Sequence, residues 1–318
     1  MRLILRSLTA AFALALSQPQ PVQAPPDTEI YLAPMKIVDG AITIGPAENI
    51  TNNPGYDNQP FFTPDGRAIL FTSVRPSTVL GPGAAGQTDI YRYDIASKSI
   101  SQVTNTSESE YSPTITPAGA LSVVRVETDE AKTQRLWQFT LDGRDPRLVL
   151  EAVKPVGYHA WVDDHTLALF ILGANGTPAT LQLADTRTGS ARVLASDIGR
   201  SIQRIPGTTD TAHISFTQRE RVGDATVRTI KELDPTTGAI ATLAPAIDGD
   251  PAELDTAWTP DGTLLAARRG VLYGWRRGDS RWKEIANLER LSLSGVTRLA
   301  ISPKGDFLAL VASPRATR

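Results

Sequence analysis

The chain of 318 residues contains no cysteine, two methionines and three histidines. The absence of cysteine excludes disulfides, thiolate catalysis, and zinc or iron–sulfur sites that use cysteine ligands. With 32 basic and 34 acidic residues the formal net charge is −2, so nothing in the composition predicts attraction to nucleic acid or to an anionic membrane.

Long apolar segments are also missing, apart from a short one near the start of the chain. Two arginines, Arg2 and Arg6, precede the apolar stretch Leu8–Leu16, which is too short to span a bilayer. A polar, proline-rich segment follows and ends in a small-x-small pattern at Ala24, although the next residue is proline, so cleavage after Ser17 is the alternative. We interpret residues 1–24 as a secretory signal peptide. We therefore expect a periplasmic or secreted protein with no membrane span in its mature chain.

The sequence does contain a short motif that occurs six times. The clearest copies consist of Thr or Ser, Pro, a variable residue and Gly: Thr63–Gly66, Thr116–Gly119, Thr259–Gly262 and Ser302–Gly305. Two degenerate copies lie between them, at residues 160–165 and 204–208. Successive copies are 43 to 54 residues apart.

This motif has the chemistry of a tight turn between two antiparallel strands. Proline fixes φ at the second position, glycine takes the position with φ > 0, and the Thr or Ser hydroxyl can hydrogen-bond back onto the turn. Two more strand-like segments follow, as Asp89–Asp94 and Ser99–Thr104 follow the first copy. Four antiparallel strands at this period make the blade of a β-propeller. We predict an all-β fold, a six-bladed β-propeller of four-stranded antiparallel blades, forming a single domain over residues 25–318.

The last copy is two strands short, and the missing pair stands at the start of the mature chain. Thr28–Leu32 matches the third-strand segment Thr88–Arg92, and Ala41–Ile44 with the residues after it matches a fourth strand. We predict that residues 28–51 complete the blade begun by residues 295–312. Such a blade closes the ring and leaves no free inner edge.

The segments Pro60–Gly66, Ile69–Phe71 and Asp89–Tyr91 together resemble the repeat of the TolB-like β-propeller family. The resemblance covers the propeller only, without the N-terminal α/β domain that TolB carries. It implies the six-bladed fold, whereas propellers of this type serve as scaffolds, as gating domains of serine peptidases and as lyases. The sequence has no Gly-x-Ser-x-Gly motif, which argues against a peptidase.

Functional residues are expected where the chain enters the first strand of each blade, because these segments form one rim of the central channel. The segments are polar in this sequence. We predict that the ligand- or partner-binding rim consists of Asp57, Asn58, Gln59, Glu110, Tyr111, Tyr158, His159, Arg200, Gln203, Glu253, Asp255 and Arg298. The other interpretation is a solvated channel whose polar walls bind nothing.

Two features bear on metal binding. His159 has no histidine at metal-ligand spacing, so we interpret it as a side chain hydrogen-bonded within the channel wall. Asp248 and Asp250 begin a short acidic segment that lacks the spacing of a calcium loop, and we interpret it as solvated. We predict no cofactor and no metal, with calcium in the channel or in this acidic loop as the alternative.

These observations predict an exported, non-enzymatic binding or scaffold propeller that recognises a protein or envelope component at its channel rim. We expect a monomer without a nucleic-acid partner. The alternative is a metal-assisted hydrolase or lyase acting on a glycan or lactone. Its acid–base and charge-stabilising residues would be Asp57, Glu110, His159, Arg200 and Asp255. A purely structural module is the third possibility.

Overall fold

The computed structural model describes residues 26–75, 87–208, 211–247 and 252–315. Apart from one 3-10 helix, η1 (Glu289–Leu291), the regular structure of these residues consists of β-strands. The proposed signal peptide, residues 1–24, lies outside this part of the chain. Within it, no helix has the length and apolar character needed to cross a membrane.

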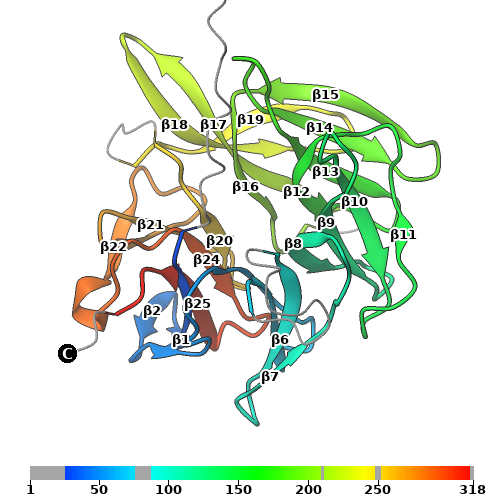
Figure 1. Ribbon diagram of the computed structural model, residues 1–318. Helices are drawn as coiled ribbons and strands as arrows, with labels where there is room; N and C mark the ends of the chain where they lie inside the picture. Colours follow the sequence, from blue (N-terminus) through cyan, green and yellow to red (C-terminus); the bar gives the residue numbers. More distant parts are fainter. Residues whose placement is uncertain (1–25, 76–86, 209–210, 248–251, 316–318) are drawn as a thin grey trace, which may run out of the picture.

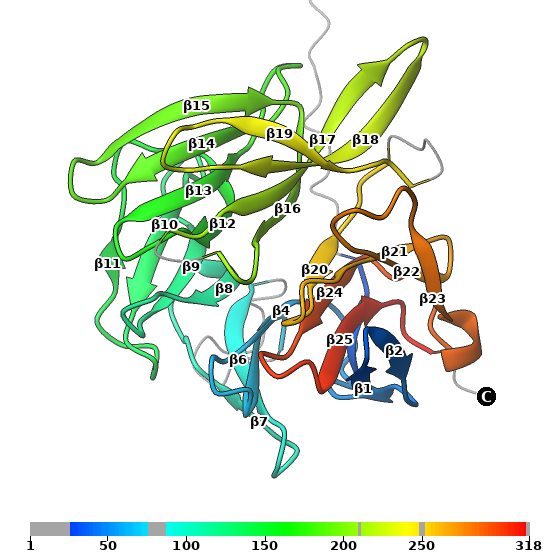
Figure 2. The same ribbon diagram turned by 180° about the vertical axis from the view of Figure 1, so that it is seen from behind.

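Five blades each consist of four consecutive antiparallel strands (Figure 1). In chain order their strands are β4 (Asp57–Phe62), β5 (Ala68–Ser73), β6 (Asp89–Asp94) and β7 (Ser99–Gln102); β8 (Ser109–Ile115), β9 (Leu121–Val126), β10 (Gln134–Phe139) and β11 (Arg147–Leu148); β12 (Val156–Trp161), β13 (Thr166–Ile171), β14 (Thr180–Asp185) and β15 (Ser190–Ser196); β16 (Ile198–Arg204), β17 (Ile214–Val222), β18 (Ala225–Leu233) and β19 (Ile240–Ala244); β20 (Thr256–Trp258), β21 (Leu264–Arg268), β22 (Val271–Trp275) and β23 (Lys283–Asn287). The first strand of each blade faces the centre of the ring (Figure 2).

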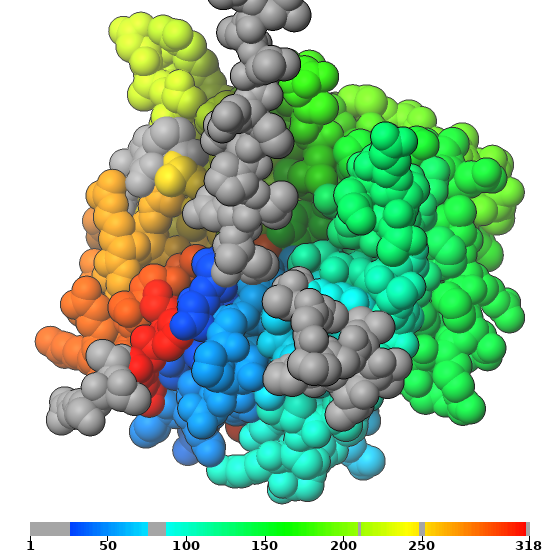
Figure 3. Space-filling model, viewed as in Figure 1, coloured from blue at the N-terminus to red at the C-terminus, as the bar shows by residue number. Residues whose placement is uncertain are grey.

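The sixth blade joins the two ends of the chain, as predicted. β24 (Arg298–Ile301) and β25 (Phe307–Ala312) are followed in the sheet by β1 (Glu29–Val38), which pairs antiparallel with β25. The fourth position is shared by β2 (Ala41–Ile44) and β3 (Glu48–Asn49), which pair with different parts of β1. The N-terminal strands lie directly against the C-terminal strand in the space-filling view (Figure 3). The six-bladed ring and its closure by residues 28–51 are therefore confirmed.

The repeated turn has the geometry that its sequence predicts. In the first blade the Thr63 hydroxyl donates to Asp65 Oδ1 (2.6 Å) and accepts a hydrogen bond from the Ala68 N–H (3.1 Å). Gly66 follows with φ of 71°, a conformation in which a Cβ would be strained. The same motif thus holds the first and second strands of a blade in register at each of its clear copies.

The buried apolar side chains of the described residues form six clusters, and each cluster lies between two neighbouring blades. Strand β1 contributes to two of them because its side chains alternate between its faces. Ile30 and Leu32 pack toward the first blade, and Tyr31, Ala33 and Met35 pack toward the fifth. The closing strand is therefore part of both interfaces of the sixth blade.

One hairpin departs from the regular blade. β17 and β18 pair over their whole length, from Ile214↔Leu233 to Val222↔Ala225, and project beyond the neighbouring blades (Figures 1 and 2). This hairpin and the segment after it account for the longest step between two copies of the repeat.

Candidate functional site

A cavity of about 570 Å³ lies inside the ring of first strands, and all six blades line it. At one end its lining residues belong to the repeated turns and are exposed, among them Pro64, Pro117 and Pro303. At the other end the lining side chains are buried or half-buried, as Arg298 and Asp255 are. The cavity therefore opens toward the turns and is narrowed at the end where the first strands begin.

Each blade places one polar residue at the inner end of the cavity. In each blade one backbone N–H closes the turn by bonding to the second strand, and these N–H groups belong to Thr63, Thr116, Val162, Ile205, Thr259 and Ser302. The polar residues stand four positions before them: Gln59, Ser112, Tyr158, Ser201, Asp255 and Arg298. Side chains on a strand repeat with a period of two, so the residues two positions before the turn also reach the cavity. Those residues are Phe61, Thr114, Ala160, Gln203, Ala257 and Ala300. We call the set four positions before the turn the polar layer.

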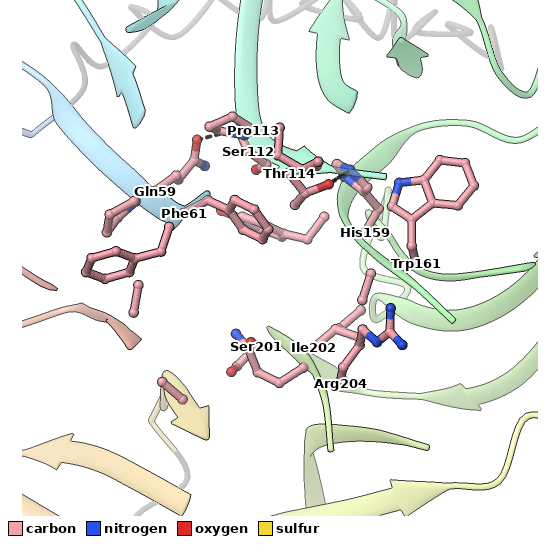
Figure 4. A pocket seen from close by; sticks show the side chains of 18 of the residues that line it. Gln59, Phe61, Ser112, Pro113, Thr114, His159, Trp161, Ser201, Ile202 and Arg204 are labelled. Atoms are coloured by element: carbon pink, nitrogen blue, oxygen red, sulfur yellow. Dashed lines mark hydrogen bonds between the residues drawn. The ribbon is translucent and has the colours of Figure 1, made fainter. Parts of the chain in front are cut away.

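The polar layer is joined by hydrogen bonds across blades. The Ser112 N–H donates to Gln59 Oε1 (2.8 Å), and the hydroxyls of Ser201 and Thr256 lie 2.9 Å apart. Figure 4 shows Gln59, Ser112 and Ser201 around the open centre of the channel. Because these polar groups bond to neighbouring blades, the layer has a defined geometry.

The charged members of the polar layer are Asp255 of the fifth blade and Arg298 of the sixth, and Arg298 reaches across the ring to Tyr158 of the third blade. Arg298 Nη2 donates to the Tyr158 hydroxyl (2.6 Å), and the guanidinium carbon lies 5.0 Å from the centre of the Tyr158 ring. Arg298 Nη1 is 3.7 Å from Asp255 Oδ2, too far for a hydrogen bond. Burial raises the pKa of Asp255, against the lowering effect of Arg298 and Arg200. Arg200 itself donates to the carbonyl of Thr297 (3.0 Å).

The walls between the polar layer and the turns are mainly apolar. Their larger side chains are Phe61, Phe62, Ile115, Trp161, Ile202, Trp258, Leu299 and Ile301. The indole N–H of Trp161 donates to Ser122 (2.9 Å), and that of Trp258 donates to Ser215 (2.8 Å). Because its N–H group is already bonded, the half-buried Trp258 contributes apolar surface to the cavity, whereas Trp161 is almost wholly buried between the second and third blades.

His159 is part of this wall. Its Nε2 atom lies 2.9 Å from the Thr114 hydroxyl and 2.8 Å from the Ser122 hydroxyl (Figure 4). Burial lowers the pKa of His159 to about 3, so the ring is neutral at physiological pH. These contacts agree with the interpretation of His159 as a side chain hydrogen-bonded within the channel wall.

The predicted rim residues divide into two groups. Those that line the cavity are Gln59, Tyr158, His159, Arg200, Gln203, Asp255 and Arg298. Those absent from its lining are Asp57, Asn58, Glu110, Tyr111 and Glu253. Ser112, Ser201, Trp161 and Trp258 also line it, although the rim prediction did not include them. The sequence signal that would have identified them is their position relative to the turn: the two serines stand four residues before it and the two tryptophans one residue before it.

Asp57 and Glu110 lie outside the cavity. Each is hydrogen-bonded to an arginine on or just after the second strand of its own blade, Arg75 and Arg125 respectively. Asp57 accepts hydrogen bonds from Ser73 (2.6 Å) and Arg75 (3.3 Å), and Glu110 accepts one from Arg125 Nε (3.1 Å). Both carboxyl groups are fully buried. They join strands within their blades, so they do not converge with His159 on a common point in the cavity.

The other three predicted residues also contact the protein itself. Asn58 donates to Thr28 at the closing segment (3.3 Å), and the rings of Tyr111 and Tyr56 pack edge to face with centres 6.5 Å apart. Glu253 accepts a hydrogen bond from the Arg200 N–H (3.1 Å). These contacts position the loops around the narrow end of the channel.

The acidic segment gives no evidence of a metal centre. Asp248 and Asp250 lie outside the described residues. Within the described ranges, no group of three His, Asp or Glu side chains is placed to hold a metal ion. The interpretation of this segment as a solvated loop, with calcium binding as the alternative, stays a prediction of the sequence.

No protein-family model and no curated protein matches the chain. Solved structures do match it. The putative TolB from Agrobacterium tumefaciens has a TM-score of 0.61 and 15% sequence identity, over 90% of this chain and 98% of that one. The chain has the TolB-like β-propeller fold.

Two further structures share this TolB-like fold. TolB from Acinetobacter baumannii has a TM-score of 0.54 and 14% identity, over 92% of this chain and 66% of that one. The oligogalacturonate lyase from Vibrio parahaemolyticus has a TM-score of 0.56 and 12% identity, over 86% of this chain and 81% of that one. Because TolB proteins and a lyase share the fold, the function of this TolB-like propeller has to be argued from its cavity.

Proposed function

We propose that the protein is an exported, non-enzymatic binding propeller whose central cavity receives part of a protein or envelope component. The observation that carries the proposal is the cavity itself, about 570 Å³ with mainly apolar walls and a polar layer at its inner end. Sites of this size, with apolar walls and a few fixed polar groups, are typical of ligand binding. The proposal of export rests on the signal-like segment at residues 1–24.

The composition of the walls favours binding over a merely solvated channel. Water in a cavity is held by two to four polar partners, and the walls between the polar layer and the turns offer few. Phe61 and Trp258, both half-buried, instead present apolar aromatic surface to this space. Covering such surface with a ligand removes it from water and is favourable.

The positions of the charged groups favour binding over catalysis. The alternative of a hydrolase or lyase requires an acid and a base that meet at one point. Asp57 and Glu110 are bonded to arginines outside the cavity, and His159 Nε2 is occupied by two hydroxyls. Asp255 is the one carboxylate among the described residues that line the cavity, so no pair of carboxyl groups meets there.

Site-specific cross-linking tests the proposed function. Phe61 points into the cavity (Figure 4), so benzoylphenylalanine placed there should be photo-cross-linked to the bound partner in intact cells. Leu141 is 57% exposed in a turn at the outside of the second blade and is the matched control position. We expect a discrete cross-linked product from position 61 and none from position 141. Absence of a product at position 61, or the same product from both positions, would contradict the proposal.

A further inference from the structure

The inner end of the cavity carries more positive than negative charge. Among the charged side chains that line this end, Arg200 and Arg298 are cationic and Asp255 is anionic. Arg298 is 9% exposed, so solvent screens its charge poorly. A monovalent anion would balance the three groups.

Arg298 also has unused hydrogen-bonding capacity. A guanidinium has five N–H donors, and the hydrogen bond that Arg298 makes within the described ranges is the one to the Tyr158 hydroxyl. The remaining donors of Arg298 are not among the fully buried unbonded atoms of the described residues, so a ligand in the cavity can reach them. Tyr158 accepts that bond, and no described residue accepts the proton of its own hydroxyl. Arg298 and Tyr158 together can therefore donate to one anionic group.

The path from the polar layer to the mouth is short and mainly apolar. Four strand residues separate the polar layer from the turn, which corresponds to about 13 Å. Phe61, Ile202 and Trp258 are among the side chains along this path. A ligand that reaches Arg298 from the mouth therefore needs an apolar body of this length behind its charged end.

We infer that the inner end of the cavity binds a carboxylate that terminates an apolar chain, with Arg298 and Tyr158 as its donors. The planar fork of a guanidinium matches the two oxygens of a carboxylate, which favours this anion. The inference rests on the proposed binding function and specifies the chemistry of the ligand. Both a peptide with an apolar C-terminus and a medium-chain organic acid have this chemistry.

Calorimetric titration of the mature protein with matched pairs of probes tests the inference. The peptide pair is acetyl-Ala-Ala-Phe with a free carboxylate and the same peptide amidated, and the acid pair is octanoate and octanol. We expect the free acid of at least one pair to bind about tenfold or more tightly than its neutral partner, as a charge-assisted bond to a buried guanidinium predicts. Preference for the peptide acid identifies a peptide C-terminus as the source, and preference for octanoate identifies an organic acid.

Two substitutions locate the recognition. Arg298→Gln keeps a donor for Tyr158 but removes the charge, and it should abolish the preference for the acid. Arg144→Gln removes an exposed arginine in a turn at the outside of the second blade, away from the cavity, and should leave the preference unchanged. Thermal melting shows whether each variant is folded. If Arg298→Gln does not fold, the salt dependence of the wild-type protein decides: the affinity for the acid should fall with added salt, and that for the neutral partner should not.

The inference is overturned if acid and neutral probes bind equally, if none of the probes binds, or if a folded Arg298→Gln variant keeps the preference. None of these results bears on cross-linking from position 61. Failure of the carboxylate inference is therefore distinguishable from failure of the proposed function.

Discussion

Replacing Ala33 with aspartate should lower the free energy of unfolding by roughly 3–5 kcal/mol, the usual cost of an uncompensated buried charge. Ala33 is fully buried in β1, where it pairs with Leu308 of β25 and packs toward the fifth blade. An aspartate at this position has no cationic partner among the residues of that cluster. The substitution should therefore separate the closing strand from the sixth blade and expose the apolar surface of both its interfaces.

Urea unfolding followed by circular dichroism measures this effect, with Lys36→Asp as the matched control. Lys36 lies on the same strand but is exposed, so its variant should unfold within about 0.5 kcal/mol of the wild type. Equal stability of the Ala33→Asp and Lys36→Asp variants would mean that β1 does not close the ring.

Raising the pH from 5 to 8 should destabilise the protein through Asp89 and Glu110, which lie at the junction of the first and second blades. Both side chains are buried, the charge of Asp89 acts on the Glu110 carboxyl, and Arg125 bonds to Glu110 (3.1 Å). Burial raises the pKa of Asp89 to about 6 from 3.8. Burial likewise raises the pKa of Glu110 to about 7 from 4.5.

The direction of this pH effect on stability follows from the number of protons bound by the folded and unfolded states. Because both pKa values are higher in the folded protein, it holds more protons than the unfolded chain between about pH 4 and pH 7. The stabilisation is complete below pH 4 and is lost as the pH rises toward 7. Its slope is about 1.4 kcal/mol per pH unit for each proton that only the folded state retains.

The variant Asp89→Asn measures how much of the pH dependence comes from Asp89 and Glu110. Asparagine does not titrate, and it removes the charge that helps raise the pKa of Glu110, so the decline in stability between pH 5 and 8 should be smaller than in the wild type. Denaturant unfolding at pH 5, 6, 7 and 8 measures it, with Glu130→Gln, an exposed turn residue, as the control that should follow the wild type. A decline in Asp89→Asn as steep as that of the wild type would show that the pair does not titrate in this range.

The architecture was predictable because it depends on a local pattern that recurs. The turn at Thr63–Gly66 needs proline and glycine for reasons of backbone geometry, and copies of it mark each blade. The closure was predictable because the strands missing at the C-terminus are present at Glu29–Val38. Neither inference required knowledge of which side chains face the channel.

The cavity was less predictable because it depends on which residues face inward and which partners they find. Asp57 and Glu110 were predicted at the rim from their position in the chain, but Arg75 and Arg125 bind them inside the blades. The long hairpin of β17 and β18 turns at Gly223, which has φ of 60° and lies outside the repeated motif. Tertiary contacts of this kind are set by residues far apart in the sequence.

The most direct test of the central claim is to fill the cavity and measure cross-linking from position 61. Ala300 lines the cavity, and Ala300→Trp should occupy it, whereas Ala96→Trp adds the same side chain at an exposed turn of the first blade. If the partner binds in the cavity, Ala300→Trp should abolish the cross-linked product while the protein remains folded, and Ala96→Trp should leave the yield unchanged. An unchanged yield in a folded Ala300→Trp variant would contradict binding inside the propeller.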